Sequence, residues 1–168
     1  MKVNVKKLAL AGMMTAIGVS LSTFSIPIGV SRCFPIQHLL NVLAGVFLGP
    51  WYGVGFACST ALIRNLIGTG SLLAFPGSMV GAFCCGMLFR YTKKVPMALM
   101  GEVFGTGIIG GLLCYPIATL LLGNKDAAIV TYVLPFLIST LGGTFLAGLL
   151  LWGLYQSKAI YYLKQLLE

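Results

Sequence analysis

Ten side chains from five segments of this hydrophobic chain could form one polar ligand site. They are Gln37, His38, Asn41, Arg64, Asn65, Ser71, Phe75, Ser78, Tyr115 and Tyr132. His38 and Asn41 lie about one helical turn apart at the start of a short apolar run. Arg64 and Asn65 end the next run, just before a segment rich in glycine, serine and threonine. Amides, hydroxyls, an imidazole and aromatic rings suit the binding of a small molecule, because ligand pockets are largely apolar with a few placed polar groups.

Arg64 and His38 also allow purely structural roles. The arginine could extend its charged end to the outer lipid headgroups, and the histidine could bond a loop carbonyl. Ionisable groups inside a membrane are costly and usually face an interior or a cavity, so the whole set favours a pocket.

Glu102 stands apart from this set. Its early position in an apolar run places it nearer the opposite membrane surface, where it could pair with a lysine such as Lys94. It could also serve a proton-coupled cycle together with His38. The chain has three acidic residues in all, so the pairing is favoured over a longer proton relay.

A stripe of small residues follows one face of the first apolar run. It consists of Ala9, Gly12, Ala16 and Ser20, at spacings of three and four. Small residues let another helix approach closely, so the stripe could pack within this protein or dock another subunit.

Other kinds of chemistry lack their residues here. The five cysteines lie scattered in apolar segments without a Cys-x-x-Cys or histidine pairing, so neither a zinc site nor a disulfide framework is predicted. The sequence contains no phosphate-binding Gly-x-x-x-x-Gly-Lys-Ser/Thr loop and no hydrolase motif. We therefore expect no catalysis, no metal and no cofactor.

The elements that must position these residues are membrane helices. Hydrophobic residues make up 58% of the 168 and charged residues 8%, whereas soluble domains carry about 25% charged residues. A run of about 20 apolar residues crosses a bilayer. The candidate runs are roughly 8–28, 51–67, 74–91, 97–121 and 129–155, with a shorter one at 36–48 that could cross or re-enter. The sequence predicts one all-α integral membrane domain over 1–168.

Basic residues decide whether the short run crosses. The net charge is +8, and six helices with both termini in the cytoplasm place eight basic residues inside and three at or near the outside. The inner ones are Lys2, Lys6, Lys7, Arg90, Lys93, Lys94, Lys158 and Lys164, and the outer ones are Arg32, Arg64 and Lys125. Basic residues prefer cytoplasmic loops, so we expect six helices in the cell membrane and no nucleic-acid partner.

Two runs resemble a known family. Residues 33–53 contain Cys-Phe-Pro-Ile-Gln-His-Leu-Leu-Asn-Val and Gly-Val-Phe-Leu-Gly-Pro-Trp-Tyr-Gly, and residues 64–78 read Arg-Asn-Leu-Ile-Gly-Thr-Gly-Ser-Leu-Leu-Ala-Phe-Pro-Gly-Ser. With them, essentially the whole chain resembles the ThiW family, substrate-binding S components of energy-coupling-factor (ECF) vitamin transporters.

The resemblance implies a six-helix S-component bundle open to the outside. It also implies a membrane coupling subunit and two cytoplasmic ATPases as partners, and the thiamine precursor hydroxyethylthiazole as ligand. The small-residue stripe would dock the coupling subunit, and segments 29–35 and 64–78 would form and cover the pocket.

For a thiazole ligand, hydrogen bonds are expected from His38, Asn41 and Asn65. Stacking is expected from Phe34, Phe75, Tyr115 and Tyr132, and not from Trp51 at the inner end of its helix. Arg64 could order its loop or bind an anionic ligand such as a phosphorylated thiazole. The ordering role is favoured, because a neutral thiazole needs no cation.

Three other functions stay open. The chain could be an S component for another thiamine-related precursor, a standalone proton-coupled carrier or channel using Glu102 and His38, or a membrane scaffold without a ligand.

Overall fold

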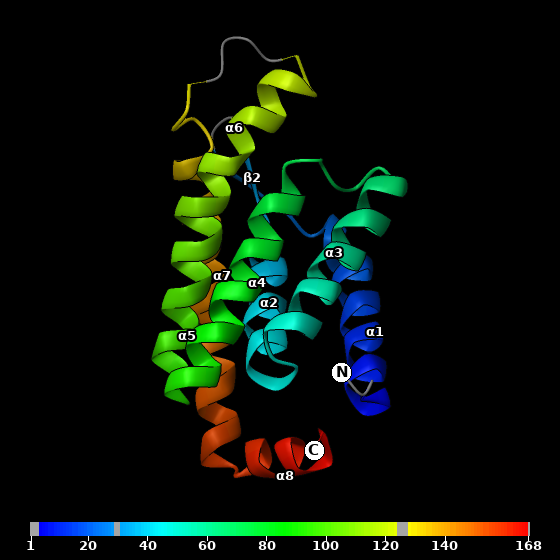
Figure 1. Cartoon of the computed structure of the whole chain (residues 1–168), viewed down its shortest axis with the longest axis vertical. Helices are drawn as coiled ribbons and strands as arrows, with labels where there is room; N and C mark the ends of the chain where they lie inside the picture. Colours follow the sequence, from blue (N-terminus) through cyan, green and yellow to red (C-terminus); the bar gives the residue numbers. More distant parts are fainter. Residues whose placement is uncertain (1–3, 29–30, 124–127, 168) are drawn as a thin grey trace.

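The computed structural model describes residues 4–28, 31–123 and 128–167, and this part of the chain is mostly helical (Figure 1). The α-helices are α1 (Val5–Ser20), α2 (Pro35–Phe47), α3 (Pro50–Leu66), α4 (Ala74–Thr92), α5 (Val95–Glu102), α6 (Gly111–Leu120), α7 (Val133–Gln156) and α8 (Ala159–Leu167). The 3₁₀ turn η1 (Leu21–Thr23) extends α1, and the π-helical segment η2 (Val103–Gly110) joins α5 and α6 into one rod. Strands β1 (Ile26–Ile28) and β2 (Ser31–Cys33) form an antiparallel hairpin.

The rods α1, α2, α3, α4, α5–η2–α6 and α7 form a bundle and run alternately up and down (Figure 1). Both ends of the described chain lie at one end of this bundle, called here the termini end, and α8 lies across it. The opposite end, called the cavity end, holds the α3–α4 loop and the hairpin. The short α2 occupies the interior and packs against α4, α7 and α3.

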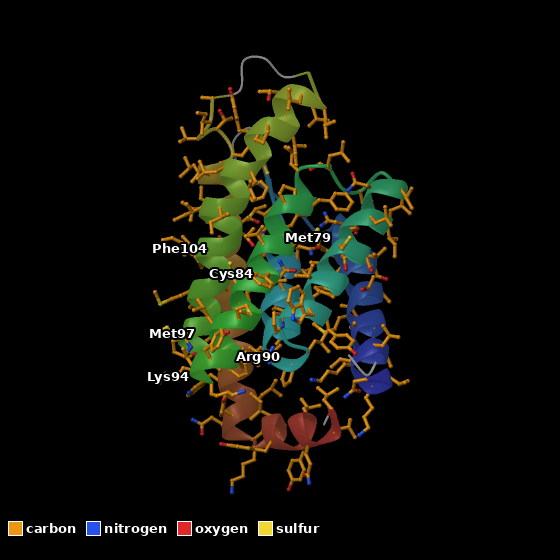
Figure 2. All side chains as sticks on the ribbon, viewed as in Figure 1. Met79, Cys84, Arg90, Lys94, Met97 and Phe104 are labelled. Atoms are coloured by element: carbon orange, nitrogen blue, oxygen red, sulfur yellow. The ribbon has the colours of Figure 1, made fainter. Side chains whose placement is uncertain are left out.

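The outer surface of the bundle is apolar. Phe104, Leu141 and Phe145 are each more than half exposed, and Phe104 points away from its rod (Figure 2). Three described helical stretches are long and apolar enough to cross a membrane: Val5–Thr23, Val95–Leu120 and Val133–Gln156. The 13-residue α2 is a shorter apolar helix. Apolar groups face outward where a soluble protein presents charge, so this is a multi-pass membrane protein.

Local sequence sets the helix boundaries at the termini end. Gly49, with φ of +84°, makes the sharp turn between α2 and α3, and Pro50 then occupies the first turn of α3. Proline is tolerated there because the first N–H groups of a helix have no partner within the helix. This turn brings α2 and α3 into antiparallel contact.

Glycines bring α4 and the α5–η2 rod very close together. A Cβ added at Gly101 would lie 2.8 Å from backbone atoms of Cys84 and Cys85, and one at Gly105 would lie 2.9 Å from the Cα of Gly81. Side chains larger than hydrogen would separate the two backbones. The close approach presses the inner face of the rod, with Glu102, into the centre of the bundle.

The structure differs from the predicted boundaries in two places. The first helix was expected over 8–28, but α1 and η1 end at Thr23 and a strand follows at Ile26. Hydroxyl side chains at 22, 23 and 25 compete for backbone hydrogen bonds, and Pro27 disfavours helical geometry at the residue before it. At the other terminus, a separate amphipathic helix, α8, follows the predicted last run. The remaining rods lie within a few residues of their predicted ranges.

Some expectations fall outside the described residues. These are Lys2 and Lys125 in the charge count and residues 29–30 of the predicted covering segment. Phe34, at the end of that segment, is described and borders the site discussed next.

Candidate ligand-binding site

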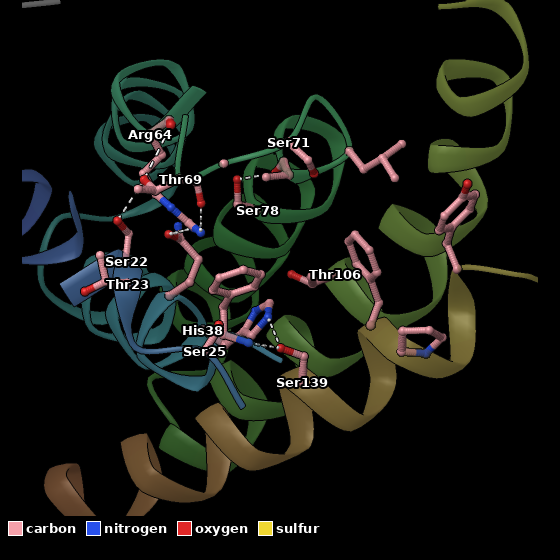
Figure 3. Close-up of a pocket in the computed structure, with 18 of the residues that line it drawn as sticks. Ser22, Thr23, Ser25, His38, Arg64, Thr69, Ser71, Ser78, Thr106 and Ser139 are labelled. Carbon is pink, nitrogen blue, oxygen red and sulfur yellow. Dashed lines mark hydrogen bonds between the residues drawn. The ribbon is translucent and has the colours of Figure 1, made fainter. Parts of the chain in front are cut away.

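A cavity of about 560 Å³ lies at the cavity end of the bundle (Figure 3). Its walls come from η1 and the residues after it, the first turns of α2, the α3–α4 loop, η2 and the start of α7. The lining residues are Ser22, Thr23, Ser25, Phe34, Gln37, His38, Arg64, Gly68, Thr69, Gly70, Ser71, Leu73, Ala74, Ser78, Thr106, Tyr132, Pro135, Phe136 and Ser139. Small-molecule pockets range over roughly 300–1,000 Å³, so a single-ring heterocycle fits.

One hydrogen-bond network runs from this cavity into the core. The Arg64 Nη1 donates to Gln37 Oε1 at 3.0 Å, and the Gln37 amide donates to Asn41 Oδ1 at 3.4 Å. Asn41 Nδ2 in turn donates to Glu102 Oε1 at 3.0 Å. Arginine can only donate and a carboxylate only accepts, so the two ends dictate the orientation of both amides. Bonds aligned in this way polarise and strengthen one another.

Glu102 is the buried anchor of that network. Its side chain has no exposed surface, and its Oε1 lies within 3.0 Å of His38 Nδ1 and 2.9 Å of the Thr106 hydroxyl, besides the contact with Asn41. The π-helical segment begins directly after Glu102, and Thr106 lies within it. Irregular π-helical turns occur frequently at functional sites. These three contacts all lie at Oε1, whereas Oε2 is buried without a hydrogen-bond partner among the described residues.

His38 connects the carboxylate to the cavity wall. Its Nδ1 faces Glu102, and its Nε2 lies 3.0 Å from the Ser139 Oγ, which also accepts a bond from the Phe34 backbone N–H. A neutral imidazole protonated on Nδ1 satisfies all these contacts: it donates to Glu102 and accepts from the Ser139 hydroxyl. The histidine therefore ties α2, α5, α7 and the hairpin end together, as Figure 3 shows for its contact with Ser139.

Arg64 is almost completely buried, with 3% of its surface exposed. Besides its bond to Gln37, its Nη2 donates to the Thr69 carbonyl at 3.2 Å, and its guanidinium carbon lies 4.6 Å from the centre of the Phe34 ring. Its Nε is buried without a hydrogen-bond partner among the described residues. Burial excludes the alternative in which this arginine reaches out to lipid headgroups.

The α3–α4 loop folds back onto the same residue. The Arg64 carbonyl accepts bonds from the N–H groups of Thr69 and Gly70 at 2.9 Å each. A Cβ at Gly70 would meet Arg64 at 3.0 Å, so a larger residue would crowd this tight return. Asn65 donates to the Ser71 carbonyl at 3.1 Å, and Ser22 donates to the Thr69 hydroxyl at 2.9 Å. Arg64 and Asn65 thus order the loop.

The structure brings together six of the ten predicted site residues on the cavity wall. These are Gln37, His38, Arg64, Ser71, Ser78 and Tyr132. Asn41 lies just behind that wall, fully buried and bonded to Glu102. Asn65, Phe75 and Tyr115 are not among the lining residues, and Asn65 instead caps the loop. Phe34 borders the cavity, whereas Trp51 lies at the termini end against Phe83.

Sequence analysis missed several lining residues: Ser22, Thr23, Ser25, Thr106, Pro135 and Phe136. The three hydroxyl residues fell inside the overlong first helix, although the cluster Ser22-Thr23-x-Ser25 is itself a signal for a helix end. Thr106 lies four residues after Glu102, so both share one face of the rod and could have been paired by spacing.

The prediction that Glu102 pairs with a lysine such as Lys94 was wrong. Lys94 lies at the termini end of the bundle (Figure 2), while Glu102 lies one residue short of η2 and contacts His38. The reason is the length of α2. A 13-residue helix that ends at the termini end begins deep in the bundle, so its first turn meets the middle of the neighbouring rod. Among the described residues, no three His, Cys, Asp or Glu side chains converge on a metal-sized site.

Fold and cavity together define a multi-pass membrane protein with a polar, ligand-sized site near one end of its bundle. The family model described as thiamine-precursor transporter protein (ThiW) matches residues 8–157. The chain belongs to the ThiW family of transporter proteins.

A curated protein also shows distant similarity to this chain. The biotin transporter BioY of Rhodobacter capsulatus is 29% identical over 126 residues, and the match covers 64% of this chain and 64% of that protein, less than two thirds of its length. No solved structure matches the chain.

Proposed function

We propose that this chain is the substrate-binding S component of an ECF-type importer. Its ligand is a thiazole precursor of thiamine, with hydroxyethylthiazole as the compound that the family resemblance implies. The observation that carries the proposal is the cavity of about 560 Å³, lined by hydroxyls, an imidazole and aromatic rings, in a member of a thiamine-precursor transporter family. Such a lining suits a small aromatic heterocycle.

The proposed topology has six membrane crossings and both termini in the cytoplasm. Both ends of the described chain lie at one end of the bundle, and Arg90 and Lys94 lie at that same end (Figures 1 and 2). Basic residues favour the cytoplasmic side, so the cavity faces outward, where an importer must collect its ligand.

Binding is the direct test of the ligand. Purified protein in detergent is titrated with radiolabelled hydroxyethylthiazole at micromolar concentration, and saturable binding is expected. If the thiazole does not bind while another thiamine precursor does, the ligand assignment is wrong.

ATP hydrolysis is proposed to come from partner subunits, namely a membrane coupling subunit and two cytoplasmic ATPases. The small-residue stripe of Ala9, Gly12, Ala16 and Ser20 is exposed along α1, and a Cβ at Gly12 would meet nothing within 4 Å. An exposed flat face on a membrane helix can receive another helix, so the coupling subunit is proposed to dock there.

A pair of glycine variants tests this docking. Gly12 and Gly142 are both exposed helical glycines with open space around the position of a Cβ, but only Gly12 lies in the stripe. We expect Gly12→Leu to abolish ATP-dependent uptake while ligand binding persists, and Gly142→Leu to keep both. Loss of binding in Gly12→Leu, or normal uptake by it, would exclude a docking role.

The contact between His38 and Glu102 favours a second candidate, a standalone proton-coupled carrier. The imidazole of His38, which lines the cavity, lies 3.0 Å from the carboxylate of Glu102. This candidate requires uptake of hydroxyethylthiazole into vesicles that contain only this chain, driven by a pH gradient. The S-component proposal requires that no such uptake occurs until the partner subunits and ATP are added.

A further inference from the structure

Arg64 is a buried cation with no carboxylate partner among the described residues. Salt bridges among the described residues involve His38 and Glu102 alone, and Glu102 uses its Oε1 for His38, Asn41 and Thr106. The described residues that line the cavity include no carboxylate. Buried charges in proteins are normally paired, because an unpaired one loses its hydration without compensation.

The donors of this guanidinium are also incompletely used. It has five N–H groups, and two of them bond the described chain, at Gln37 Oε1 and the Thr69 carbonyl. The Nε–H is buried and has no partner in the described residues. The Phe34 ring covers the guanidinium at 4.6 Å and holds it against the cavity. A preformed cation with spare donors is thus fixed at the edge of a ligand-sized space.

Hydroxyl groups surround the same corner of the cavity. Figure 3 shows Ser22, Thr23 and Thr69 beside Arg64, from η1 and the α3–α4 loop. Ser71 and Ser78 add two more hydroxyls to the lining. The hydroxyls of Ser22, Thr69 and Ser78 already donate to Thr69 Oγ1, the Arg64 carbonyl and the Ala74 carbonyl. The main donor available to an anion is therefore the guanidinium, whose fork matches phosphate and carboxylate geometry. A neutral alcohol would use one of its N–H groups and leave the charge uncompensated.

We propose that the ligand places an anionic oxygen group against Arg64, so that the site selects an acidic thiazole over the neutral alcohol. This rests on the proposed function, in which the ligand is a thiazole, and it names the chemical class of that ligand more narrowly. The acidic group is a phosphate ester or a carboxylate, which share the chemistry that Arg64 recognises. Hydroxyethylthiazole is then a weaker ligand of the same site.

Three thiazoles with the same ring test the proposal by titration calorimetry on the purified full chain. They are hydroxyethylthiazole, its phosphate monoester, and the analogue with a carboxymethyl group in place of the hydroxyethyl group. For the wild type we expect one of the two acids to bind at least about tenfold more tightly than the alcohol, since a charge-assisted bond exceeds a neutral one. Which acid binds more tightly distinguishes phosphate from carboxylate.

Substitutions then assign the preference to the arginine. Arg64→Gln should bring the ratio of acid to alcohol affinity to about one, and Arg64→Lys should keep part of the preference, because lysine retains the charge without the fork. Arg90→Gln, at an exposed arginine of the termini end, is the matched control and should keep the full ratio. If Arg64→Gln fails to fold, the wild-type ratio and Arg64→Lys decide the question.

Two outcomes would overturn the proposal. Equal affinities of the alcohol and both acids for the wild type would refute the anionic ligand and leave the proposed function standing. A preference for acids that persists in Arg64→Gln would refute the role of Arg64. Absence of binding by all three thiazoles would instead refute the proposed function itself.

Discussion

The two ends of the bundle differ in whether their charged side chains are buried or exposed. At the cavity end, Arg64 and Glu102 are buried and joined through Gln37 and Asn41. At the termini end, a second cavity of about 460 Å³ is bordered by Lys7, Arg90 and Lys93, and the latter two are exposed. Exposed cations are hydrated and need no fixed partner, whereas buried charges must find donors and acceptors inside the protein.

The difference assigns different roles to the two sets of charges. The exposed cations at the termini end are hydrated, so their exact positions matter little. The charges at the cavity end build a defined shape, because each hydrogen bond restricts the next side chain. If this comparison holds, substitutions at the cavity end affect stability and binding, and equivalent ones at the termini end do not.

Glu102→Ala is the most severe test of the comparison. It leaves His38, Asn41 and Thr106 without their shared acceptor, and each buried donor left without a partner costs about 1–3 kcal/mol. We expect a large fall in thermal stability in detergent, together with loss of ligand binding. Lys93→Ala is the control and should unfold like the wild type. Similar losses in both variants would contradict the contrast between the two ends.

Gly81→Ala tests whether close packing of α4 positions the carboxylate. A Cβ at Gly81 would lie 2.6 Å from Glu102 Oε2 and would overlap the Thr106 hydroxyl. Overpacking of this kind costs about 1–3 kcal/mol, so a clear drop in thermal stability is expected. Gly55→Ala, in α3, meets nothing within 4 Å and provides the matched control. An unchanged denaturation midpoint in Gly81→Ala would show that the approach of α4 to the rod is looser than described.

Ser139→Ala sharpens the comparison within the cavity end. It removes the shared partner of His38 Nε2 and of the Phe34 N–H, with an expected loss of about 1 kcal/mol in unfolding free energy. Because Phe34 also covers Arg64, ligand affinity should fall as well. Thermal denaturation and binding titration on the same sample separate the two effects. A stability loss without any change in affinity would place the Phe34 contact outside the binding function.

Arg90→Gln should have the least effect. Arg90 is exposed at the end of α4, and surface substitutions of this kind usually change stability by about 0.5 kcal/mol or less. The denaturation midpoint and the thiazole affinity should both match the wild type. A substantial change in either would mean that the second cavity has a structural role of its own.

Much of the fold could be predicted from the hydrophobic runs and from the prolines and glycines that mark their ends. Pro35, Pro50 and the Gly49 turn mark boundaries that the structure places within a residue or two of the expected ones. The end of the first helix was misjudged, since Ile26 and Ile28 extend the apolar run past the hydroxyl residues that stop it. Hydrophobicity alone does not distinguish a membrane helix from a short apolar strand that covers a cavity.

The residues of the candidate site were harder to predict from the sequence than the helix boundaries. Six predicted residues line the cavity because they cluster at helix ends, where polar residues are conspicuous in an apolar chain. Asn65 and Tyr115 were predicted at the same membrane depth, but neither lines the cavity. The direction of a side chain depends on the rotation of its helix against its neighbours, and local composition does not specify that rotation.

The sequence by itself determined that this is a membrane protein, that it resembles the ThiW family, and that a polar site lies near residues 37–41 and 64–78. Only the tertiary structure decided that Glu102 pairs with His38, 64 residues away, and that Arg64 has no carboxylate partner among the described residues. Composition and residue spacing are properties of a single helix, so they can be read directly from the sequence. Pairing across helices depends on the depth at which each helix begins and on how closely glycines let two backbones approach, and both are properties of the packed bundle.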